Sequence, residues 1–435
     1  MPSSYSYISR SLAKAFVLGA IREEDMIAHA AGLFFRDSDT PAWLPPLARH
    51  VEAAFADCAV RPMWAEVCDE IVECEVFNEA WDKGKASLGS TRVPVAAKMV
   101  PGRGAPSRWQ VPDATDSAEL ARVLELHLDD LGWLSSQSGM TRHYHLRWHR
   151  KKGNPNARLI EIPKPMLKDT QRIILNKILD SIPVHESACG FQKGRSIMDF
   201  VAPHTNQEMV LKMDLKDFFP SISSSRVFRL FMTAGYPESV AGKLADLCTN
   251  RIDEELTDDS NLDPSTRRIL QQKHLPQGAP TSPALANLIA FGLDCRLAGL
   301  ARSAGINYTR YADDLLFSGG NGFRRQCQRF HLKVLTIVIE EGFRVNTRKT
   351  RFMPGSQRQT AVGLVLNEKP NLRRSDFDEL KAILTNCVRQ GWRSQNRKNH
   401  DAFRSHLQGR VGWAHQANPE KAEKLWRLFE QIDWS

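Results

Sequence analysis

Two adjacent aspartates, Asp313 and Asp314, stand between two apolar segments, in the order Tyr311-Ala312-Asp313-Asp314-Leu-Leu-Phe. An acidic pair of this kind is usually the solvated tip of a hairpin, but such a turn normally favours Gly or Asn, and this one has neither. A further acid, Asp214, ends another apolar segment, where it can project from the edge of a sheet. Because neighbouring strands lie about 4.8 Å apart, carboxylates on two of them can converge.

Converging carboxylates suit phosphoryl transfer to a 3′-hydroxyl, which uses two Mg²⁺ ions about 3.5–4 Å apart. Mg²⁺ takes octahedral oxygen ligands and is usually held by few carboxylates plus substrate phosphates. We expect Asp214 and Asp313 to bridge both ions, with Mn²⁺ able to substitute. The backbone carbonyl of Leu215 is expected to complete the ion on the triphosphate side. Asp314 is expected as an outer ligand or as a group that supports the ligands.

Several segments resemble the conserved motifs of reverse transcriptases. The Tyr-x-Asp-Asp turn resembles motif C, and Met213-Asp-Leu-Lys-Asp-Phe-Phe resembles motif A. Between them, Leu-Pro-Gln-Gly-Ala-Pro-Thr-Ser-Pro at 275–283 resembles motif B, and residues 346–350 and 363–367 resemble motifs D and E. Motifs in the family's order are far more specific than any one alone. The resemblance implies an RNA-directed DNA polymerase that uses dNTPs.

The resemblance also assigns roles around the nucleotide. Gly278 lets the backbone approach the template–primer end closely, and Gln277 can hydrogen-bond near the incoming nucleotide. Phe219 is expected under the sugar, where its ring would clash with a 2′-hydroxyl. The alternative is that Phe218 and Phe219 are both core residues, and one of them is expected to be. Lys349 resembles the motif D lysine, a proton donor to pyrophosphate or a phosphate-neutralising group.

Basic residues surround this predicted site. Arg158 resembles the arginine that clamps the triphosphate in reverse transcriptases, and Lys152 or Lys151 could assist it. A solvated basic face is the usual explanation for such a run, but beside a polymerase site phosphate contacts are favoured. Three arginines near the end of the chain would lie on one face if the helix there is continuous: Arg389, Arg393 and Arg397. Such a face could bind the phosphates of a duplex, and it could equally be an ordinary solvated surface.

A narrower resemblance, to retron reverse transcriptases, runs from about residue 117 to residue 434. It rests on Gly190-Phe-Gln-Lys-Gly-Arg-Ser-Ile, Met213-Asp-Leu-Lys-Asp-Phe-Phe-Pro-Ser-Ile and the ending at 425–434. It implies recognition of a cognate structured noncoding RNA, priming from the 2′-hydroxyl of an internal guanosine and a branched RNA–DNA product, msDNA. It also implies a role in anti-phage defence beside an effector protein.

Two segments depart from the retron pattern. Retron enzymes usually have Asn-Ala-x-x-His before motif A, where this chain has Phe200-Val-Ala-Pro-His204, with the histidine retained. They usually have Val-Thr-Gly near motif E, where this chain has Ala361-Val-Gly363. In retron enzymes both segments are associated with RNA recognition and priming, so the resemblance supports the polymerase activity more strongly than it supports the priming details. His204 and Tyr311 are expected to contact nucleic acid.

The wider composition agrees with a nucleic-acid enzyme. The formal charge is +9, and it is unevenly spread: residues 1–135 hold 13 Lys/Arg and 20 Asp/Glu, while the remainder holds 46 and 30. A basic C-terminal two-thirds is where a nucleic-acid channel is expected. The eight cysteines show no zinc-ligand spacing. The start lacks the layout of a signal peptide, and no apolar stretch is long enough for a membrane. We therefore expect a cytoplasmic protein with no membrane partner.

The helices and strands expected around these residues indicate an α+β fold, and the resemblance implies the right-hand architecture of polymerases. Alternation of polar and apolar residues predicts a two-stranded ribbon at 143–148 and 158–162. Short apolar runs predict strands at 210–213 and 362–366, and the segments 306–311 and 315–318 flank a tight acidic turn, which predicts a hairpin. Helices are predicted at 167–182, 283–300 and from 370 to the end. The predicted domains are a mostly helical, acidic accessory domain (1–116), the first part of the fingers (117–205), a palm (206–370) with a fingers insertion at about 226–275, and a helical thumb (371–435).

Three alternatives stay open. A helix predicted to start at Asp116 could begin a DNA-reading helix-turn-helix, although no basic recognition helix follows it. The enzyme could be a non-retron defence reverse transcriptase with another template, which a structured RNA encoded beside the gene would argue against. It could also be an RNA-binding scaffold with a vestigial polymerase site, although the intact Asp214, Asp313 and Asp314 argue for activity.

Overall fold

The computed structural model describes residues 4–35, 40–58, 61–86, 88, 97–102, 109–136, 142–150, 157–257 and 262–435. These residues form two compact units. One comprises Met1–Pro183 with Phe219–Ile289, and the other comprises Val184–Phe218 with Ala290–Ser435. Helices dominate both units, and the sheets are small and antiparallel, which confirms the predicted α+β class at this level.

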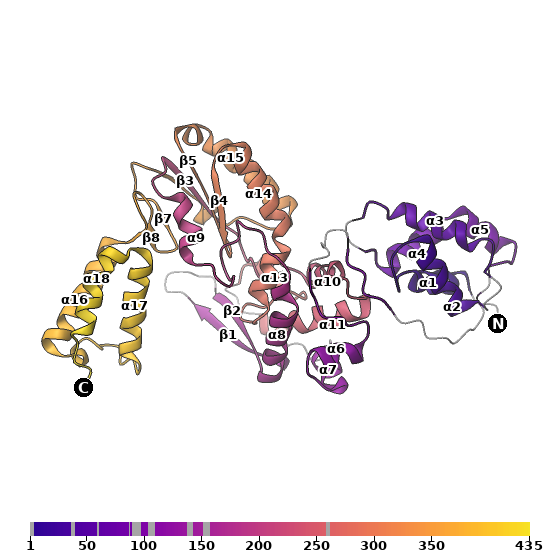
Figure 1. Cartoon of the computed structure of the whole chain (residues 1–435), viewed down its shortest axis with the longest axis horizontal. Coiled ribbons are helices and arrows are strands. Elements are labelled where there is room, and N and C mark those ends of the chain that lie inside the picture. Colours follow the sequence, from indigo (N-terminus) through magenta and orange to yellow (C-terminus); the bar gives the residue numbers. More distant parts are fainter. Residues whose placement is uncertain are drawn as a thin grey trace. The chain divides into compact units, whose positions relative to one another are not determined.

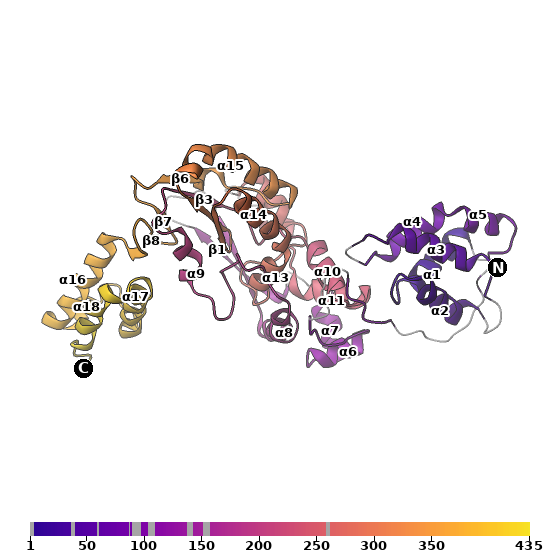
Figure 2. The same ribbon diagram turned by 45° about the horizontal axis from the view of Figure 1, so that its top comes forward.

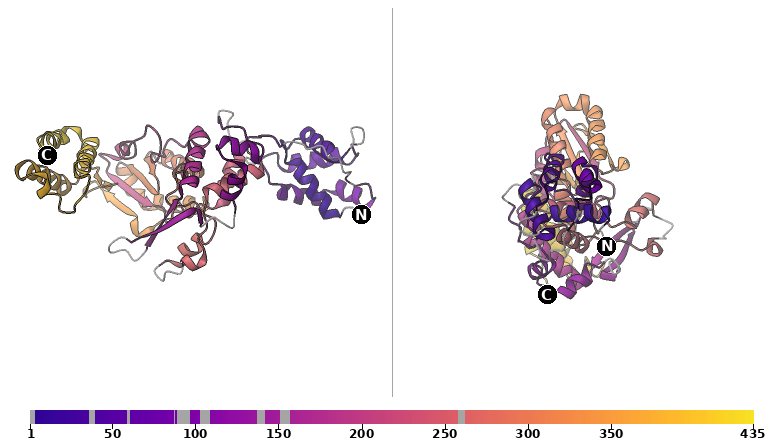
Figure 3. Two further views of the ribbon diagram at one scale, coloured as in Figure 1. Left: turned by 90° about the horizontal axis from the view of Figure 1, so that it is seen from below. Right: turned by 90° about the vertical axis from the view of Figure 1, so that its right-hand side faces the viewer.

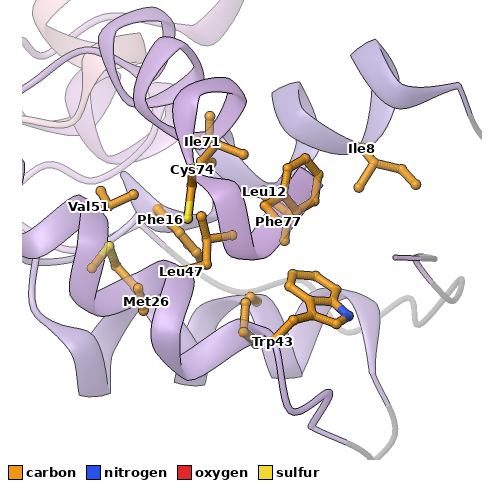
Figure 4. Packing of buried hydrophobic residues seen from close by; sticks show 14 of the residues in the cluster. Ile8, Leu12, Phe16, Met26, Trp43, Leu47, Val51, Ile71, Cys74 and Phe77 are labelled. Carbon is orange, nitrogen blue, oxygen red and sulfur yellow. The ribbon is translucent and has the colours of Figure 1, made fainter. Parts of the chain in front are cut away.

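The N-terminal part of the first unit is a bundle of helices, as the sequence predicted (Figure 1). Its core is apolar and closely packed: Leu12, Phe16, Leu47 and Phe77 are completely buried, and Trp43 lies among them (Figure 4). Burial of so many large side chains stabilises the bundle at roughly 25 cal/mol per Å² of apolar surface. The helices are α1 (Tyr5–Phe16), α2 (Glu23–Phe34), α3 (Leu44–Ala54), α4 (Trp64–Glu73) and α5 (Glu75–Asp82).

The rest of the first unit carries the predicted ribbon, which is confirmed as β1 (Tyr144–Arg150) paired with β2 (Ala157–Pro163). The helix predicted to start at Asp116 does so, because the Asp116 carboxylate accepts the backbone N–H of Glu119 at 2.8 Å. The other helices are α6 (Ser117–Val123), α7 (Leu128–Leu134), α8 (Pro165–Lys177), α10 (Ser224–Thr233), α11 (Glu238–Cys248), α12 (Pro264–Leu270) and α13 (Ser282–Ile289), with 3₁₀ turns η2 (Leu179–Ser181) and η4 (Glu254–Thr257).

The second unit is built on a four-stranded antiparallel sheet in the order β4-β5-β3-β6. Helices α14 and α15 cover one face, while α9 and the 3₁₀ turn η3 lie against the other (Figures 1 and 2). The elements are α9 (Ile197–Val201), η3 (Ala202–His204), β3 (Met209–Asp214), α14 (Phe291–Ser303), β4 (Asn307–Tyr311), β5 (Asp314–Gly319), α15 (Asn321–Glu340), η5 (Thr347–Lys349) and β6 (Arg351–Pro354). The predicted strands at 210–213, 306–311 and 315–318 are confirmed.

Several predicted elements differ from the structure. The helix expected at 167–182 ends at Lys177, and the 3₁₀ turn η2 follows it. The helix expected at 283–300 is two helices, α13 and α14, separated at Ala290. The strand expected at 362–366 is shortened to β8, because Val362 and Gly363 form a tight turn with φ of 45° and 86°. This turn joins β7 (Thr360–Ala361) to β8 (Leu364–Val365), which pairs with β9 (Asn371–Leu372).

The C-terminal segment is helical as predicted, and its three helices lie side by side (Figures 1 and 3). They are not continuous, however: α16 ends at Gln390, and Gly391 follows with a φ of 79°. The expectation that Arg389, Arg393 and Arg397 share one helical face is therefore wrong. The helices are α16 (Arg374–Gln390), α17 (Phe403–Ala417) and α18 (Pro419–Glu430), with η6 (Trp392–Ser394) between the first two.

All eight cysteines are free thiols. Among the described helices, no single one is both long and apolar enough to cross a membrane, although the bent pair α13 and α14 together passes by length and composition.

Candidate active site

The three acidic residues singled out in the sequence lie at one end of the sheet of the second unit. Asp214 ends β3, and in the strand register it lies opposite Asp314, the first residue of β5. Asp313 lies in the two-residue turn that joins β4 to β5. The backbone N–H of Leu215 donates to the Asp313 carbonyl oxygen at 2.8 Å, which ties the end of β3 to this turn.

Backbone strain marks the turn. Ala312 has a φ of 54°, although only Gly adopts positive φ at little cost. Strain of this kind persists only where the surrounding structure enforces it, and it is concentrated at functional sites. The turn therefore agrees with a catalytic role for Asp313.

Two lysines neutralise the acidic cluster. The Lys349 ammonium group lies 2.7 Å from Oδ2 of Asp214, and the Lys212 ammonium group lies 3.0 Å from Oδ1 of Asp314. Lys349 was predicted from the sequence, but Lys212 was missed. Its signal was present, because a residue two positions before Asp214 on a strand shares its face of the sheet.

Burial and mutual repulsion act on the other carboxylates. The pKa of Asp313 is raised by burial and then by the neighbouring charge of Asp214. The pKa of Asp314 is also raised, mainly by burial, against the opposing effect of Lys212. A cation placed among these groups would favour their ionised forms.

The donor set fits a hard divalent cation. The carboxylates supply oxygen, the ligand atom that Mg²⁺ prefers, and Mg²⁺ needs only one or two of them when substrate phosphates complete its shell. Within the described part of the chain, no three His, Cys, Asp or Glu side chains converge to hold an ion by themselves.

His204 does not lie where the sequence placed it. Its side chain is completely buried, with Nδ1 2.7 Å from the Ser318 hydroxyl and Nε2 2.8 Å from the Thr309 hydroxyl. Thr309 uses its own proton to donate to the Phe200 carbonyl, so it must accept from Nε2–H. Burial lowers the pKa of His204 to about 3. The prediction that His204 contacts nucleic acid is therefore wrong: it joins β4 to β5.

The motif B loop lies in the first unit and is tied to the β2 strand. The backbone carbonyl oxygen of Gln277 accepts a hydrogen bond from the backbone N–H of Glu161 at 2.9 Å. The Glu161 carboxylate, itself completely buried, lies 3.0 Å from Nε2 of His274 and accepts from Asn250 at 2.8 Å. Gly278 has a φ of 136°, and a Cβ there would lie 2.7 Å from the Glu161 carbonyl oxygen. Close approach to β2 is thus a second reason why glycine is required at position 278.

The remaining predicted residues lie as follows. Phe218 is buried against Phe343 with ring centroids 5.6 Å apart, whereas Phe219 is half-buried, so one of the two phenylalanines is core as expected. Arg158 is exposed on β2. Lys152 lies outside the described residues.

The last of the predicted site residues are Tyr311 and the C-terminal arginines. The half-buried Tyr311 ring lies near Phe191 and Phe200, at 5.9 and 5.7 Å between ring centroids. Arg393 stacks on Trp392 at 4.8 Å and donates to the carbonyl oxygen of Ser435. Arg389 lies on α16, and Arg397 lies in a turn between η6 and α17. Their contacts with nucleic acid stay predictions.

Comparison with known proteins agrees with this arrangement. Residues 149–366 match the family described as reverse transcriptase (RNA-dependent DNA polymerase). The chain is also 39% identical over 338 residues, 72% of its own length and 74% of the relative's, to the retron Mx65 reverse transcriptase of Myxococcus xanthus. The chain belongs to the retron-type reverse transcriptases.

Two further members of this family are similar to the chain at lower sequence identity and over fewer residues. The retron Mx162 reverse transcriptase of M. xanthus is 34% identical over 335 residues, 73% of this chain and 67% of the relative. The retron Ec86 reverse transcriptase of Escherichia coli is 34% identical over 242 residues, 55% of this chain and 68% of the relative. Membership in this family makes the chain an RNA-directed DNA polymerase that depends on divalent metal and uses a template RNA and dNTPs.

Proposed function

We propose that this retron-type reverse transcriptase carries out phosphoryl transfer at Asp214 and Asp313. The observation that supports the proposal is the meeting of both residues at one end of the sheet, across a hydrogen bond of 2.8 Å between Leu215 N–H and the Asp313 carbonyl. Two Mg²⁺ ions, held by these carboxylates and the Leu215 carbonyl, would activate the attacking hydroxyl and neutralise the triphosphate. Mn²⁺ is expected to substitute.

The other residues of the site hold and balance this centre. Lys212 neutralises Asp314 at 3.0 Å, and we assign Asp314 a supporting role beside Asp214 and Asp313. Lys349 pairs with Asp214 at 2.7 Å, and its ammonium group would turn to the pyrophosphate oxygens when a nucleotide binds. It would then neutralise the leaving group or give it a proton.

Nucleotide selection is assigned to residues of the first unit. The half-buried Phe219 would exclude a 2′-hydroxyl, and Gln277 would bind near the incoming base. Arg158, assisted by Lys152, would clamp the triphosphate with its planar, two-point guanidinium group. We assign residues 117–205 and about 226–275 to the fingers, the rest of 206–370 to the palm and 371–435 to the thumb.

We further propose that the template is a cognate structured noncoding RNA, reverse transcribed in part into msDNA from a guanosine 2′-hydroxyl. The similarity to retron enzymes over 72% of the chain supports this. Defence against phage beside an effector protein in the cytoplasm follows by the same resemblance. The acidic helices of residues 1–116 form an accessory domain for a partner protein or for the RNA, and the acid balance favours protein.

The retron proposal is tested by sequencing the nucleic acid that co-purifies with the protein from cells, after separate RNase and DNase treatments. We expect one small RNA joined covalently to a DNA strand, and only its DNA part should survive RNase. Recovery of unlinked, heterogeneous nucleic acid would contradict retron priming while leaving the polymerase activity intact.

A further inference from the structure

Arg310 is completely buried, although a charged side chain is seldom buried unless it is paired. It belongs to β4, directly before Tyr311. Because side chains alternate along a strand, Arg310 points to the sheet face covered by α14 and α15, whereas Tyr311 points to the face that carries Asp214 and Asp314. Its guanidinium therefore lies behind the catalytic turn and cannot reach the substrate.

Two contacts fix the guanidinium rigidly. Nε donates to Oδ1 of Asp294 at 2.8 Å, and Nη2 donates to Oδ2 at 2.6 Å. Asp294, on α14, is also completely buried, and the Tyr308 hydroxyl donates to its Oδ1 at 2.7 Å. A two-point fork of this kind sets orientation as well as distance.

The third contact reaches the catalytic turn itself. Nη1 of Arg310 donates to the carbonyl oxygen of Ala312 at 3.2 Å. That carbonyl belongs to the peptide group that joins the strained Ala312 to Asp313, so this bond fixes the plane from which the Asp313 side chain departs. The guanidinium also lies 5.7 Å from the centre of the Phe218 ring, on the segment that follows Asp214.

We propose that Arg310, held by Asp294, is a positioning residue that fixes the Ala312–Asp313 peptide and thereby the metal-binding geometry of Asp313. This inference rests on the proposed function of Asp313. A buried ion pair that served stability alone would need only the fork to Asp294, and buried ion pairs are weak sources of stability. The hydrogen bond to a strained peptide beside a catalytic acid is what a positioning role requires.

The test is Arg310→Lys, which keeps the charge but replaces a planar fork with a single point donor. RNA-templated primer extension should show kcat reduced about 10- to 100-fold, as expected for a misplacement of catalytic groups, with the dNTP KM changed by less than about threefold. The Mg²⁺ concentration for half-maximal activity should rise several-fold. The control is Arg296→Lys on α14, the helix that carries Asp294, because the ion pairs of Arg296 with Glu340 and Glu341 lie on the surface. This variant should behave as wild type.

A second variant covers the case in which Arg310→Lys does not fold. Tyr308→Phe removes one hydrogen bond to Asp294 and leaves no buried charge unpaired, and it should raise the half-maximal Mg²⁺ concentration by about twofold or more. Folded Arg310→Lys with wild-type kcat and Mg²⁺ dependence would overturn the inference, as would an unchanged Mg²⁺ dependence of Tyr308→Phe. Full activity of Asp313→Asn would instead overturn the proposed function of Asp313.

Discussion

Stability at mildly acidic pH should depend on one histidine. His204 is neutral in the folded protein because burial lowers its pKa to about 3, from 6.5 in an exposed setting. Below pH 6.5 the unfolded chain binds a proton there and the folded chain does not, so the free energy of unfolding falls as the pH falls towards 3. Between pH 7 and pH 5 these two pKa values give a loss of roughly 2 kcal/mol.

The assay is urea unfolding at pH 7 and pH 5, on the wild type and on His204→Gln, whose amide offers a donor and an acceptor to the same two hydroxyls but does not titrate in this range. The variant should lose roughly 2 kcal/mol less than the wild type over this interval. The exposed His415→Gln serves as a control and should follow the wild type. Equal losses in the wild type and His204→Gln would refute the buried, neutral state of His204.

Three further predictions concern the site. Gly278→Ala should reduce DNA synthesis at least about tenfold, because its Cβ would lie 2.7 Å from the Glu161 carbonyl oxygen. The control, Gly299→Ala on an open helix surface, should stabilise the folded protein by about 0.5–1 kcal/mol without loss of activity. Phe219→Ala should raise ribonucleotide incorporation on the order of tenfold in a single-nucleotide assay, while Phe218→Ala should instead lower stability by about 3–5 kcal/mol. Lys349→Ala should lower kcat about 100-fold with a smaller change in dNTP KM, measured by steady-state extension; an unchanged kcat would exclude its role at the leaving group.

Local pattern predicted much of this fold because the responsible forces are local. Short apolar runs at 210–213 and 315–318 predicted the two strands that carry Asp214 and Asp314, and the helix start at Asp116 follows from its cap. The catalytic acids were found because their residue types and order are specific to one chemistry.

Long-range packing decided what the sequence could not predict. His204 is next to a catalytic segment in sequence, but its burial depends on Thr309 and Ser318, more than a hundred residues away. The end of α16 at Gly391 separates three arginines whose spacing suggested one face, since a glycine at positive φ ends a helix readily. Lys212 gained its meaning only once β3 and β5 were paired.

The central claim, that Asp214 and Asp313 carry out RNA-templated DNA synthesis, is tested most directly by primer extension with purified wild type, Asp313→Asn and Asp378→Asn. Asp378 lies on the surface of α16, in an ion pair with Arg374. We predict that Asp313→Asn extends the primer at least about 1,000-fold more slowly at saturating Mg²⁺ and dNTP, while it melts as the wild type does and Asp378→Asn is fully active. A folded Asp313→Asn that extends the primer at the wild-type rate would contradict the account.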